Sequence, residues 1–195
     1  MKLVVASNNQ GKIREIKEIF SGYFEPIQSL REAGIELEAE ENGTSFEENA
    51  LIKARAAREY ISAAVLSDDS GLCVECLNGA PGIHSARYAG EPCDDERNIQ
   101  KLLECCRRYP GPWPAHFHSA VVLIYPDGRE VVAHGDAFGQ IIEQRRGEDG
   151  FGYDPVFYYP PLNKTFGEMT PGEKNAVSHR RKALDALYQK IKTES

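Results

Sequence analysis

The chain has 195 residues, enough for one sizeable domain or two closely packed lobes. Its net charge is −7 and its basic residues are scattered, which argues against a protein that follows a nucleic acid polymer and leaves small anionic ligands open. Because no apolar run is long enough to cross a membrane and the first residues do not resemble a signal peptide, we expect a soluble cytoplasmic protein without a membrane partner. Five cysteines without a secretion signal predict free thiols.

The first predicted elements are a strand near 2–6 and a helix near 11–21, joined by a polar turn at 7–12. Such a junction directs helix N-terminal amides and the positive end of the helix dipole at one point, and Lys12 adds an ammonium group. The turn therefore suits a phosphate, although it lacks the Ser or Thr that a Walker A loop needs at Ile13. The alternative is an ordinary turn in which Asn and Ser act as capping residues.

A short strand is predicted near 24–28, and Thr44 with Glu47 forms a capping box that opens the second helix. Asn49 and Lys53 share a face of this helix that differs from its apolar face. The sequence therefore predicts an amide and an ammonium group side by side.

An acidic cluster follows the buried strand predicted at 64–66, where Asp68, Asp69, Ser70 and Gly71 indicate a turn. Clustered carboxylates suit Mg²⁺, since one or two of them together with water and substrate phosphates complete its octahedron. The acidic pair that ends in Glu41 is a candidate for a further ligand. The alternative is that the two aspartates only form the turn and that Glu41 is a solvated loop charge.

The remaining elements follow from periodicity and turn residues. They are a Gly- and Pro-rich loop over 78–92, a helix over 94–107, strands over 115–125 and 129–137 joined at Asp127-Gly128, and an irregular region over 147–172. Thr170 and Glu173 form a second capping box, which opens one C-terminal helix.

Aromatic rings alternate with glycine in Phe151-Gly152-Tyr153, which Asp154 follows. A ring on such a loop can stack on a nucleobase, a contact worth about 1–3 kcal/mol per base. Lys174 and Ser178-His179-Arg180 supply donors that suit carbonyl oxygens on a base. The alternatives are a hydrophobic plug for the loop and a solvated helix face for the basic stretch.

Taken in chain order, these motifs resemble the inosine triphosphate pyrophosphatase family, also called the Ham1 family. The resemblance rests on residues 7–12, 44–50 with Lys53, 68–71, 79–83, 85–88, 151–155 and 178–180. It implies an α/β fold with an elongated mixed central sheet flanked by helices, in a single domain over 1–195 that has two lobes and an active site in the cleft between them. It also implies a homodimer that hydrolyses the purine nucleoside triphosphates ITP, dITP and XTP to monophosphate and pyrophosphate with Mg²⁺, and so clears deaminated purines.

The resemblance further implies roles for individual residues. Asp69 matches the catalytic base or a metal-bound carboxylate, Glu41 matches its partner in holding Mg²⁺, and Asp68 is a second candidate for either role. Lys12 and Lys53 match catalytic contacts to the triphosphate. The other implied substrate contacts are Ser7, Asn8, Asn9, Gln10, Gly11, Asn49, Ser70, Phe151, Gly152, Tyr153, Asp154, Lys174, Ser178, His179 and Arg180.

Two other functions are compatible with parts of this pattern. One is a Maf-like pyrophosphatase that acts on pyrimidine or modified nucleotides. The other is a non-enzymatic module that senses triphosphates through the same turn, which Asp69, Glu41 and Lys12 argue against because a sensor needs no carboxylate to orient water. The sequence leaves open the roles of His84 and Arg87, the dimer surface, and how the 2-amino group of GTP is rejected.

Overall fold

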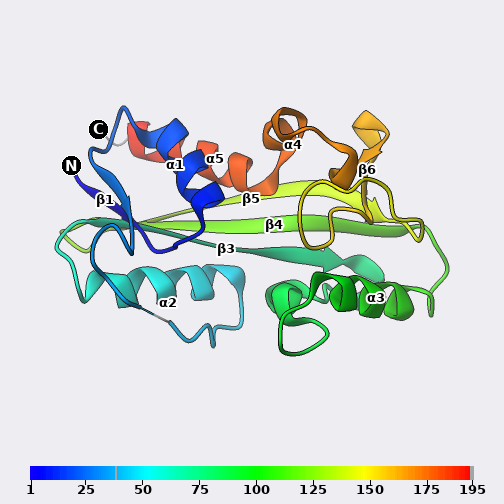
Figure 1. Cartoon of the computed structure of the whole chain (residues 1–195). Helices are drawn as coiled ribbons and strands as arrows, with labels where there is room; N and C mark the ends of the chain where they lie inside the picture. Colours follow the sequence, from blue (N-terminus) through cyan, green and yellow to red (C-terminus); the bar gives the residue numbers. More distant parts are fainter. Residues whose placement is uncertain (38, 194–195) are drawn as a thin grey trace. The chain divides into compact units, whose positions relative to one another are not determined.

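The structure is a computed structural model that describes residues 1–37 and 39–193. Over these residues the strands form one seven-stranded sheet in the order β2-β1-β3-β4-β5-β6-β7 (Figure 1). The strands are β1 Leu3–Val5, β2 Ile27–Ser29, β3 Ala64–Val74, β4 Trp113–Ile124, β5 Glu130–Ile141, β6 Phe157–Tyr159 and β7 Lys164–Thr165. Because β1 runs parallel to β2 and β3 while β6 runs antiparallel to β5 and β7, the sheet is mixed, and the predicted α/β class is confirmed.

The α-helices begin close to the predicted positions. They are α1 Gln10–Phe20, α2 Phe46–Arg58, α3 Asp95–Cys106, α4 Pro171–Val177 and α5 His179–Thr193, and short 3₁₀ turns lie at Glu75–Leu77, Gly82–Arg87, Pro160–Leu162 and Phe166–Glu168. Side chains that accept backbone N–H groups cap the starts of the first four helices. Within the described part of the chain, none of the helices has the length and apolarity that crossing a bilayer requires.

The chain divides into two compact units, which we describe separately. Unit 1 contains the residues up to Asp69, from Ser119 to Gly135 and from Arg180 onward, and unit 2 contains Ser70–His118 and Asp136–His179.

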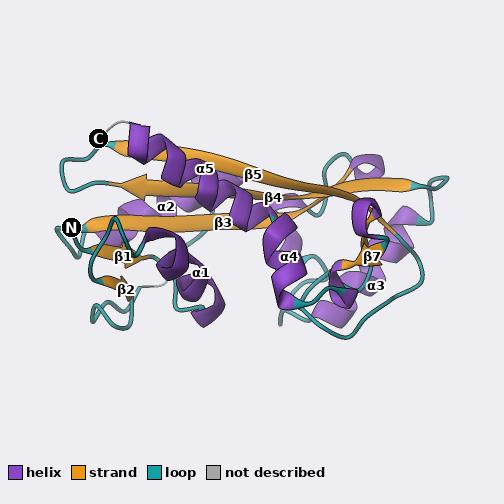
Figure 2. Ribbon diagram, turned by 90° about the horizontal axis from the view of Figure 1, so that it is seen from above, coloured by secondary structure: helices purple, strands orange, loops and turns teal. Residues whose placement is uncertain are grey.

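In unit 1, helices cover both faces of the strands. Helices α1 and α5 pack together on one face, which Figure 2 shows from above, and their core residues include Ile13, Phe20 and Leu187. Helix α2 covers the other face through small side chains such as Ala50 and Ala54. Because both faces are buried, β1 and the start of β3 are continuous apolar runs instead of alternating patterns.

Unit 2 has its own core, which contains residues of α3, β4, β6 and the last 3₁₀ turn. The rings of Phe117, Phe157 and Phe166 contact one another. The centroid of the Phe157 ring lies 4.7 Å from that of Phe117 and 4.7 Å from that of Phe166, and the centroids of Phe117 and Phe166 are 5.7 Å apart. These three rings therefore form a closely packed aromatic cluster in the core of unit 2.

The structure differs from the predicted turn at the acidic cluster. Asp68, Asp69, Ser70 and Gly71 lie inside β3, which continues to Val74. A carboxylate is unfavourable in a buried strand unless a cation compensates it, and the sequence alone does not show which cations do so. The strand is possible because lysine and arginine side chains from other elements reach both aspartates.

Two further predictions on local structure were wrong. Helix α2 is capped by Ser45, whose Oγ accepts from Glu48 N, and the Glu48 carboxylate accepts from Thr44 N and Oγ1, so the predicted pairing of Thr44 with Glu47 is wrong. The single predicted C-terminal helix is two helices, because Ser178 has an extended backbone with ψ 145°. The capping box of Thr170 with Glu173 and the hairpin at Asp127-Gly128 are confirmed, the latter with Tyr125 N bonded to Arg129 O.

Candidate functional site

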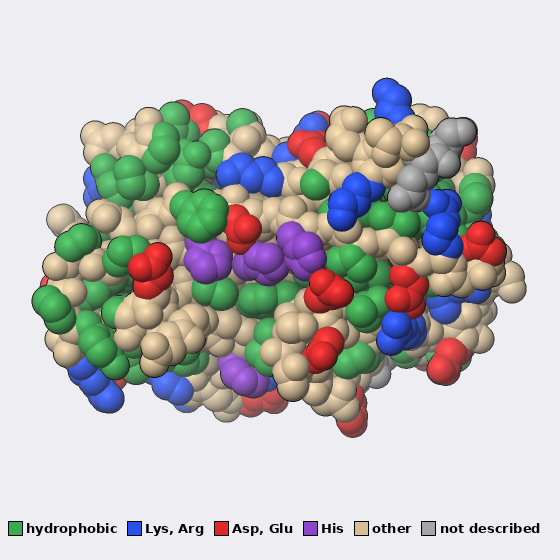
Figure 3. All heavy atoms as spheres, turned by 180° about the vertical axis from the view of Figure 1, so that it is seen from behind, with side chains coloured by type: hydrophobic (Ala, Val, Ile, Leu, Met, Phe, Trp, Pro, Cys, Tyr) green, Lys and Arg blue, Asp and Glu red, His purple; other side chains and the backbone are tan. Residues whose placement is uncertain are grey.

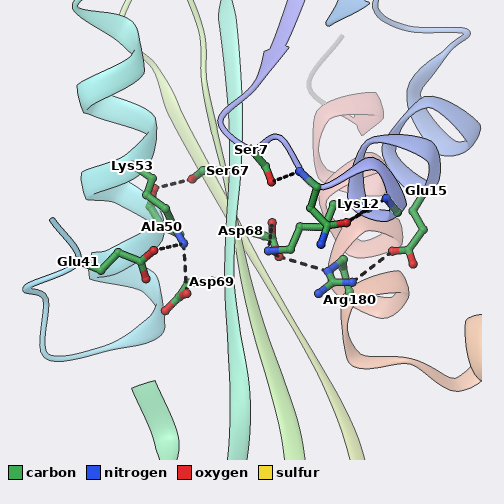
Figure 4. Close-up of polar contacts among 12 residues, drawn as sticks. Ser7, Lys12, Glu15, Glu41, Ala50, Lys53, Ser67, Asp68, Asp69 and Arg180 are labelled. Atoms are coloured by element: carbon green, nitrogen blue, oxygen red, sulfur yellow. Dashed lines mark hydrogen bonds and ion pairs between the residues drawn. The ribbon is translucent and has the colours of Figure 1, made fainter. Parts of the chain in front are cut away.

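The two aspartates of β3 form separate polar groups in unit 1. Consecutive side chains of a strand point to opposite faces, so Asp68 and Asp69 lie on opposite sides of the sheet (Figure 4). Asp68 lies on the side of α1 and α5, whereas Asp69 lies on the side of α2. One strand therefore supplies each layer of helices with a carboxylate.

Asp68 is bound by two cations. Lys12 Nζ lies 2.9 Å from Asp68 Oδ1 and 2.8 Å from Oδ2, and Arg180 Nε donates to Oδ2 at 3.2 Å. Burial alone would raise the pKa of Asp68, but Lys12 and Arg180 hold this pKa well below its usual range. Arg180 also faces Glu15, with Nη1 and Oε2 3.8 Å apart. Asp68 is thus an ionised anchor whose two oxygens are already engaged.

Asp69 is held by α2. Lys53 Nζ donates to Asp69 Oδ1 at 3.2 Å and Asn49 Nδ2 donates to Oδ2 at 3.3 Å. Asn49 and Lys53 are one helical turn apart, so the predicted shared face is confirmed. Glu41 Oε1 lies 3.3 Å from the same Lys53 ammonium. Two carboxylates therefore share one lysine.

Burial and the neighbouring charges together set the proton affinity of Asp69. Burial, with a contribution from nearby Glu41, raises the pKa of Asp69 above its ordinary value even though Lys53 opposes the shift. Lys53 itself stays protonated, because Asp69 and Glu41 raise its pKa against the effect of burial. A buried carboxylate with raised proton affinity is suited to accept a proton from water.

The turn at 7–12 is stabilised by its own side chains. Asn9 Oδ1 accepts from Gly11 N at 2.9 Å and from Lys12 N at 3.1 Å, and Ser7 Oγ accepts from Asn9 N at 3.1 Å. Asn9 therefore caps α1, and Ser7 stabilises the turn that precedes this cap. The outward Gln10 is exposed at the start of α1.

A pocket of about 280 Å³ extends from this turn to Lys53 and Glu41, and Lys53 in turn binds Asp69. Its polar lining consists of Ser7, Asn8, Glu41 and Lys53, and Leu30 and Leu37 belong to its apolar lining. Asn8 is itself fixed, since its Oδ1 accepts from Arg31 N at 3.0 Å. The pocket brings a lysine and a carboxylate to the residues of the predicted phosphate turn.

The donor set at this pocket fits Mg²⁺ bound together with a substrate. Asp69 and Glu41 offer hard oxygen ligands, and a divalent ion would offset the repulsion between these two carboxylates. Among residues 1–37 and 39–193 no group of three or more His, Cys, Asp or Glu side chains is arranged to hold a metal by itself. Water and phosphate oxygens would complete the coordination.

The aromatic loop in unit 2 is arranged around Asp154. This buried carboxylate accepts from Phe151 N at 2.9 Å and from the ammonium of Lys174, and burial raises its pKa. Lys174 Nζ also lies 4.8 Å from the centroid of the Phe151 ring, in a cation–π contact. The side chain of Phe151 is 67% exposed, so the plug alternative does not describe this ring.

The other predicted residues of unit 2 have structural contacts. Tyr153 is buried and its hydroxyl donates to Ser85 O at 2.7 Å. The His179 ring stacks on Phe117 with centroids 5.0 Å apart, and Ser178 is buried beside it in the chain. Ser70 is a half-buried residue of β3. Arg180, predicted together with His179 as a donor to the base, belongs to unit 1 and binds Asp68.

Three residues that contact predicted site residues were not identified from the sequence. Glu15 faces Arg180, Ser85 accepts the Tyr153 hydroxyl through its carbonyl, and Asp95 accepts from Gly152 N. Glu15 lies three positions after Lys12 on α1, but nothing local in the sequence links it to Arg180. Ser85 and Asp95 are distant from their partners in the chain and carry no local signal.

Histidine side chains gather on one surface of the molecule (Figure 3). In unit 2, two histidines come from alternate positions of β4. The His116 ring lies 5.4 Å from the ring of Phe138, and His118 Nδ1 lies 2.7 Å from Asp136 Oδ1. Because no metal-binding group occurs among the described residues, we assign no metal site to this surface.

The cysteines are all free thiols in the structure, as predicted. Cys73 lies in β3, whereas Cys76 lies in the 3₁₀ turn Glu75–Leu77. Burial raises the pKa of Cys73 to about 11. This thiol is therefore protonated and weakly reactive near neutral pH.

Comparison with known proteins places the chain in one family. A profile described as the Ham1 family matches residues 3–190. The dITP/XTP pyrophosphatase of Clostridium perfringens is 46% identical over 198 aligned residues, which cover 98% of this chain and 97% of that protein. The solved structure of the Staphylococcus aureus Ham1 protein superimposes with a TM-score of 0.92 at 42% identity, and that of a HAM1 protein from Coxiella burnetii with 0.92 at 39%, each over 100% of both chains. The sequence motifs, the mixed sheet and these matches agree, and the chain belongs to the Ham1 family.

Proposed function

We propose that this protein is a nucleoside triphosphate pyrophosphohydrolase that converts dITP, ITP and XTP to the monophosphate and pyrophosphate. The observation that carries the proposal is the Asp69 group, in which a carboxylate of raised pKa shares Lys53 with Glu41 next to the turn at 7–12. The name dITP/XTP pyrophosphatase, which the Clostridium perfringens relative carries, supports the same activity. In this proposal the chain works as one domain that removes deaminated purine nucleotides in the cytoplasm.

Positioning and charge neutralisation do most of the work in phosphoryl transfer. Lys53, together with Ser7 and Asn8 in the pocket, would hold the triphosphate. Lys12 would supply a further positive charge from the start of α1, where Asp68 fixes its position.

Asp69 is the proposed general base. It would accept a proton from a water molecule that attacks the α-phosphorus in line with the departing pyrophosphate. Lys53 would stabilise the charge that develops on the phosphate oxygens, because it keeps its proton beside two carboxylates. Asp68 has both oxygens engaged by cations and is proposed as an anchor, in place of the metal-binding role considered from the sequence.

Asp69 and Glu41 would hold Mg²⁺. When bound, this ion supplies positive charge and orients the phosphate groups.

Phe151 and Lys174 are the proposed contacts to the base. The exposed Phe151 ring offers a surface for stacking, and the Lys174 ammonium is a donor that a 6-oxo group accepts and a 6-amino group does not. This arrangement disfavours ATP. Rejection of GTP requires a further contact at position 2 of the base.

We also propose that the working form is a homodimer, which the resemblance to the family suggests. Sedimentation equilibrium at micromolar concentration would test this, and a species with the mass of one chain at all concentrations would contradict it.

A panel of nucleoside triphosphates with Mg²⁺ tests the proposed activity. We expect dITP, ITP and XTP to be cleaved with a kcat/KM at least about tenfold above those of ATP and GTP, because one unsatisfied buried polar group is worth that much. The products, separated by ion-exchange chromatography, should be monophosphate and pyrophosphate. Release of single orthophosphates would contradict the proposal, and preference for a pyrimidine nucleotide would favour the Maf-like alternative.

Removal of divalent ions should lower turnover of ITP at least about a hundredfold, since Asp69, Glu41 and the triphosphate repel one another without a cation. Adding Mg²⁺ back should restore the rate. The Glu41→Gln variant should need a higher Mg²⁺ concentration for half-maximal rate, whereas Glu143→Gln, in an exposed ion pair with Arg107, should need the same concentration as the parent. Undiminished turnover in excess chelator would rule out the metal requirement.

A further inference from the structure

The loop that carries Phe151 has an unusual backbone. Gly150 and Gly152 both have positive φ, at 90° and 59°, a region that side chains disfavour. A Cβ atom at Gly150 would lie 2.1 Å from Asp154 Oδ2, so only glycine fits there. With two glycines, this loop would be mobile unless its backbone were tied to neighbouring elements.

Two carboxylates bind consecutive amides of the loop. Asp154 accepts from Phe151 N at 2.9 Å, within the loop itself. Asp95 Oδ2 accepts from the next amide, Gly152 N, at 2.7 Å, although the two residues are 57 positions apart. The bond to Asp95 connects the loop backbone to helix α3, because Asp95 is the first residue of that helix.

Asp95 is not needed to cap its own helix. That role belongs to Asp94, whose Oδ1 accepts from Arg97 N at 2.9 Å. Helix α3 is itself anchored in the core of unit 2 by Ile99 and Leu102. The carboxylate of Asp95 is therefore a fixed acceptor, supplied by a rigid element, for the amide directly after Phe151.

We infer that Asp95 is a positioning residue for the purine base, which holds the 151–153 backbone so that the Phe151 ring stays exposed beside Lys174. This inference rests on the proposed function. Asp95 does not contact the base itself. Its hydrogen bond restrains the loop before binding, so the loop loses less conformational freedom when a base stacks on Phe151.

Steady-state kinetics with ITP would test the inference. In Asp95→Ala we expect KM to rise roughly five- to tenfold with kcat within about threefold of the parent, which is the size expected for one typical hydrogen bond at an exposed position. Asp95→Asn keeps an acceptor oxygen and should recover most of the lost affinity. Phe151→Ala gives the upper limit of the rise in KM, since it removes the ring on which the base stacks.

Two controls separate positioning from helix stability and from phosphate binding. Asp94→Ala removes the cap of the same helix and should lower the Tm but leave KM within twofold of the parent. Inorganic tripolyphosphate, which has no base, should inhibit the parent and Asp95→Ala with the same inhibition constant. An unchanged KM in Asp95→Ala, an equal rise in Asp94→Ala, or equally weakened tripolyphosphate inhibition would each overturn the inference.

Amide hydrogen exchange provides a readout that does not depend on catalysis. Peptides that cover 150–154 should exchange faster in Asp95→Ala than in the parent and at the parental rate in Asp94→Ala, because only the first variant loses the bond to Gly152 N. Unchanged exchange in Asp95→Ala would refute the positioning role. If the parent cleaves no nucleotide but the exchange result holds, the proposed function fails and the structural role of Asp95 stands.

Discussion

Replacing Asp69 by asparagine should lower kcat for ITP at least about a hundredfold, which is typical when a positioned general base is removed. The amide keeps the size of the side chain and a hydrogen-bond acceptor for Lys53, but it cannot accept a proton from water. The kinetic constants with ITP and Mg²⁺, measured beside the parent, give the result directly.

The same variant should not lose stability. Because the fold raises the pKa of Asp69, the ionised form is disfavoured in the native state at neutral pH, and a neutral amide removes this unfavourable term. We therefore expect the Tm of Asp69→Asn to equal or exceed that of the parent, and the variant should still bind inosine monophosphate. A fall in activity that accompanies unfolding, or activity within tenfold of the parent, would contradict the assignment of Asp69 as the base.

Replacing the neighbouring Asp68 by asparagine should have the opposite effect on stability. The variant leaves Lys12 and Arg180 facing a neutral amide, and loss of one partner from a buried ion pair destabilises a protein by about 3–5 kcal/mol. We expect the lower end of that range, about 3 kcal/mol, because the side chains of Lys12 and Arg180 are 21% and 12% exposed. For a chain of this length, thermal unfolding should show a Tm lower by about 6–12 °C.

The pH dependence of stability gives a second signature of Asp68. Its folded pKa is lowered, so the stability that its charge contributes is fully present above its unfolded value of about 4 and is lost as the pH falls below that value. The difference in Tm between the parent and Asp68→Asn should therefore be largest near neutral pH and shrink below pH ~4.

Asp185→Asn is a matched control, since Asp185 pairs with Arg181 four positions away and its side chain is 51% exposed. Its Tm should stay within about 2 °C of the parent, because surface ion pairs contribute little. If Asp68→Asn is no less stable than Asp185→Asn, or loses more activity than Asp69→Asn, the division of roles between the two aspartates is wrong.

The positions of most helices, the hairpin and the α/β class could be predicted from the sequence, because they depend on contacts between residues close in the chain. The capping box of Thr170 and Glu173 spans four residues, and the Asp127-Gly128 turn joins two adjacent strands. The shared face of Asn49 and Lys53 follows from helical periodicity alone. The ordered motifs also pointed to the Ham1 family before any geometry was known.

Only the tertiary structure distinguished the two adjacent aspartates. Asp68 and Asp69 are neighbours in the sequence and were expected in one turn, but they lie in a strand, so their side chains enter opposite layers. Asp68 meets Lys12 and Arg180, which are 56 and 112 positions away, whereas Asp69 meets Lys53 across 16 positions. A carboxylate's charge state depends on which cations and how much solvent surround it, and that surrounding exists only after the chain has folded.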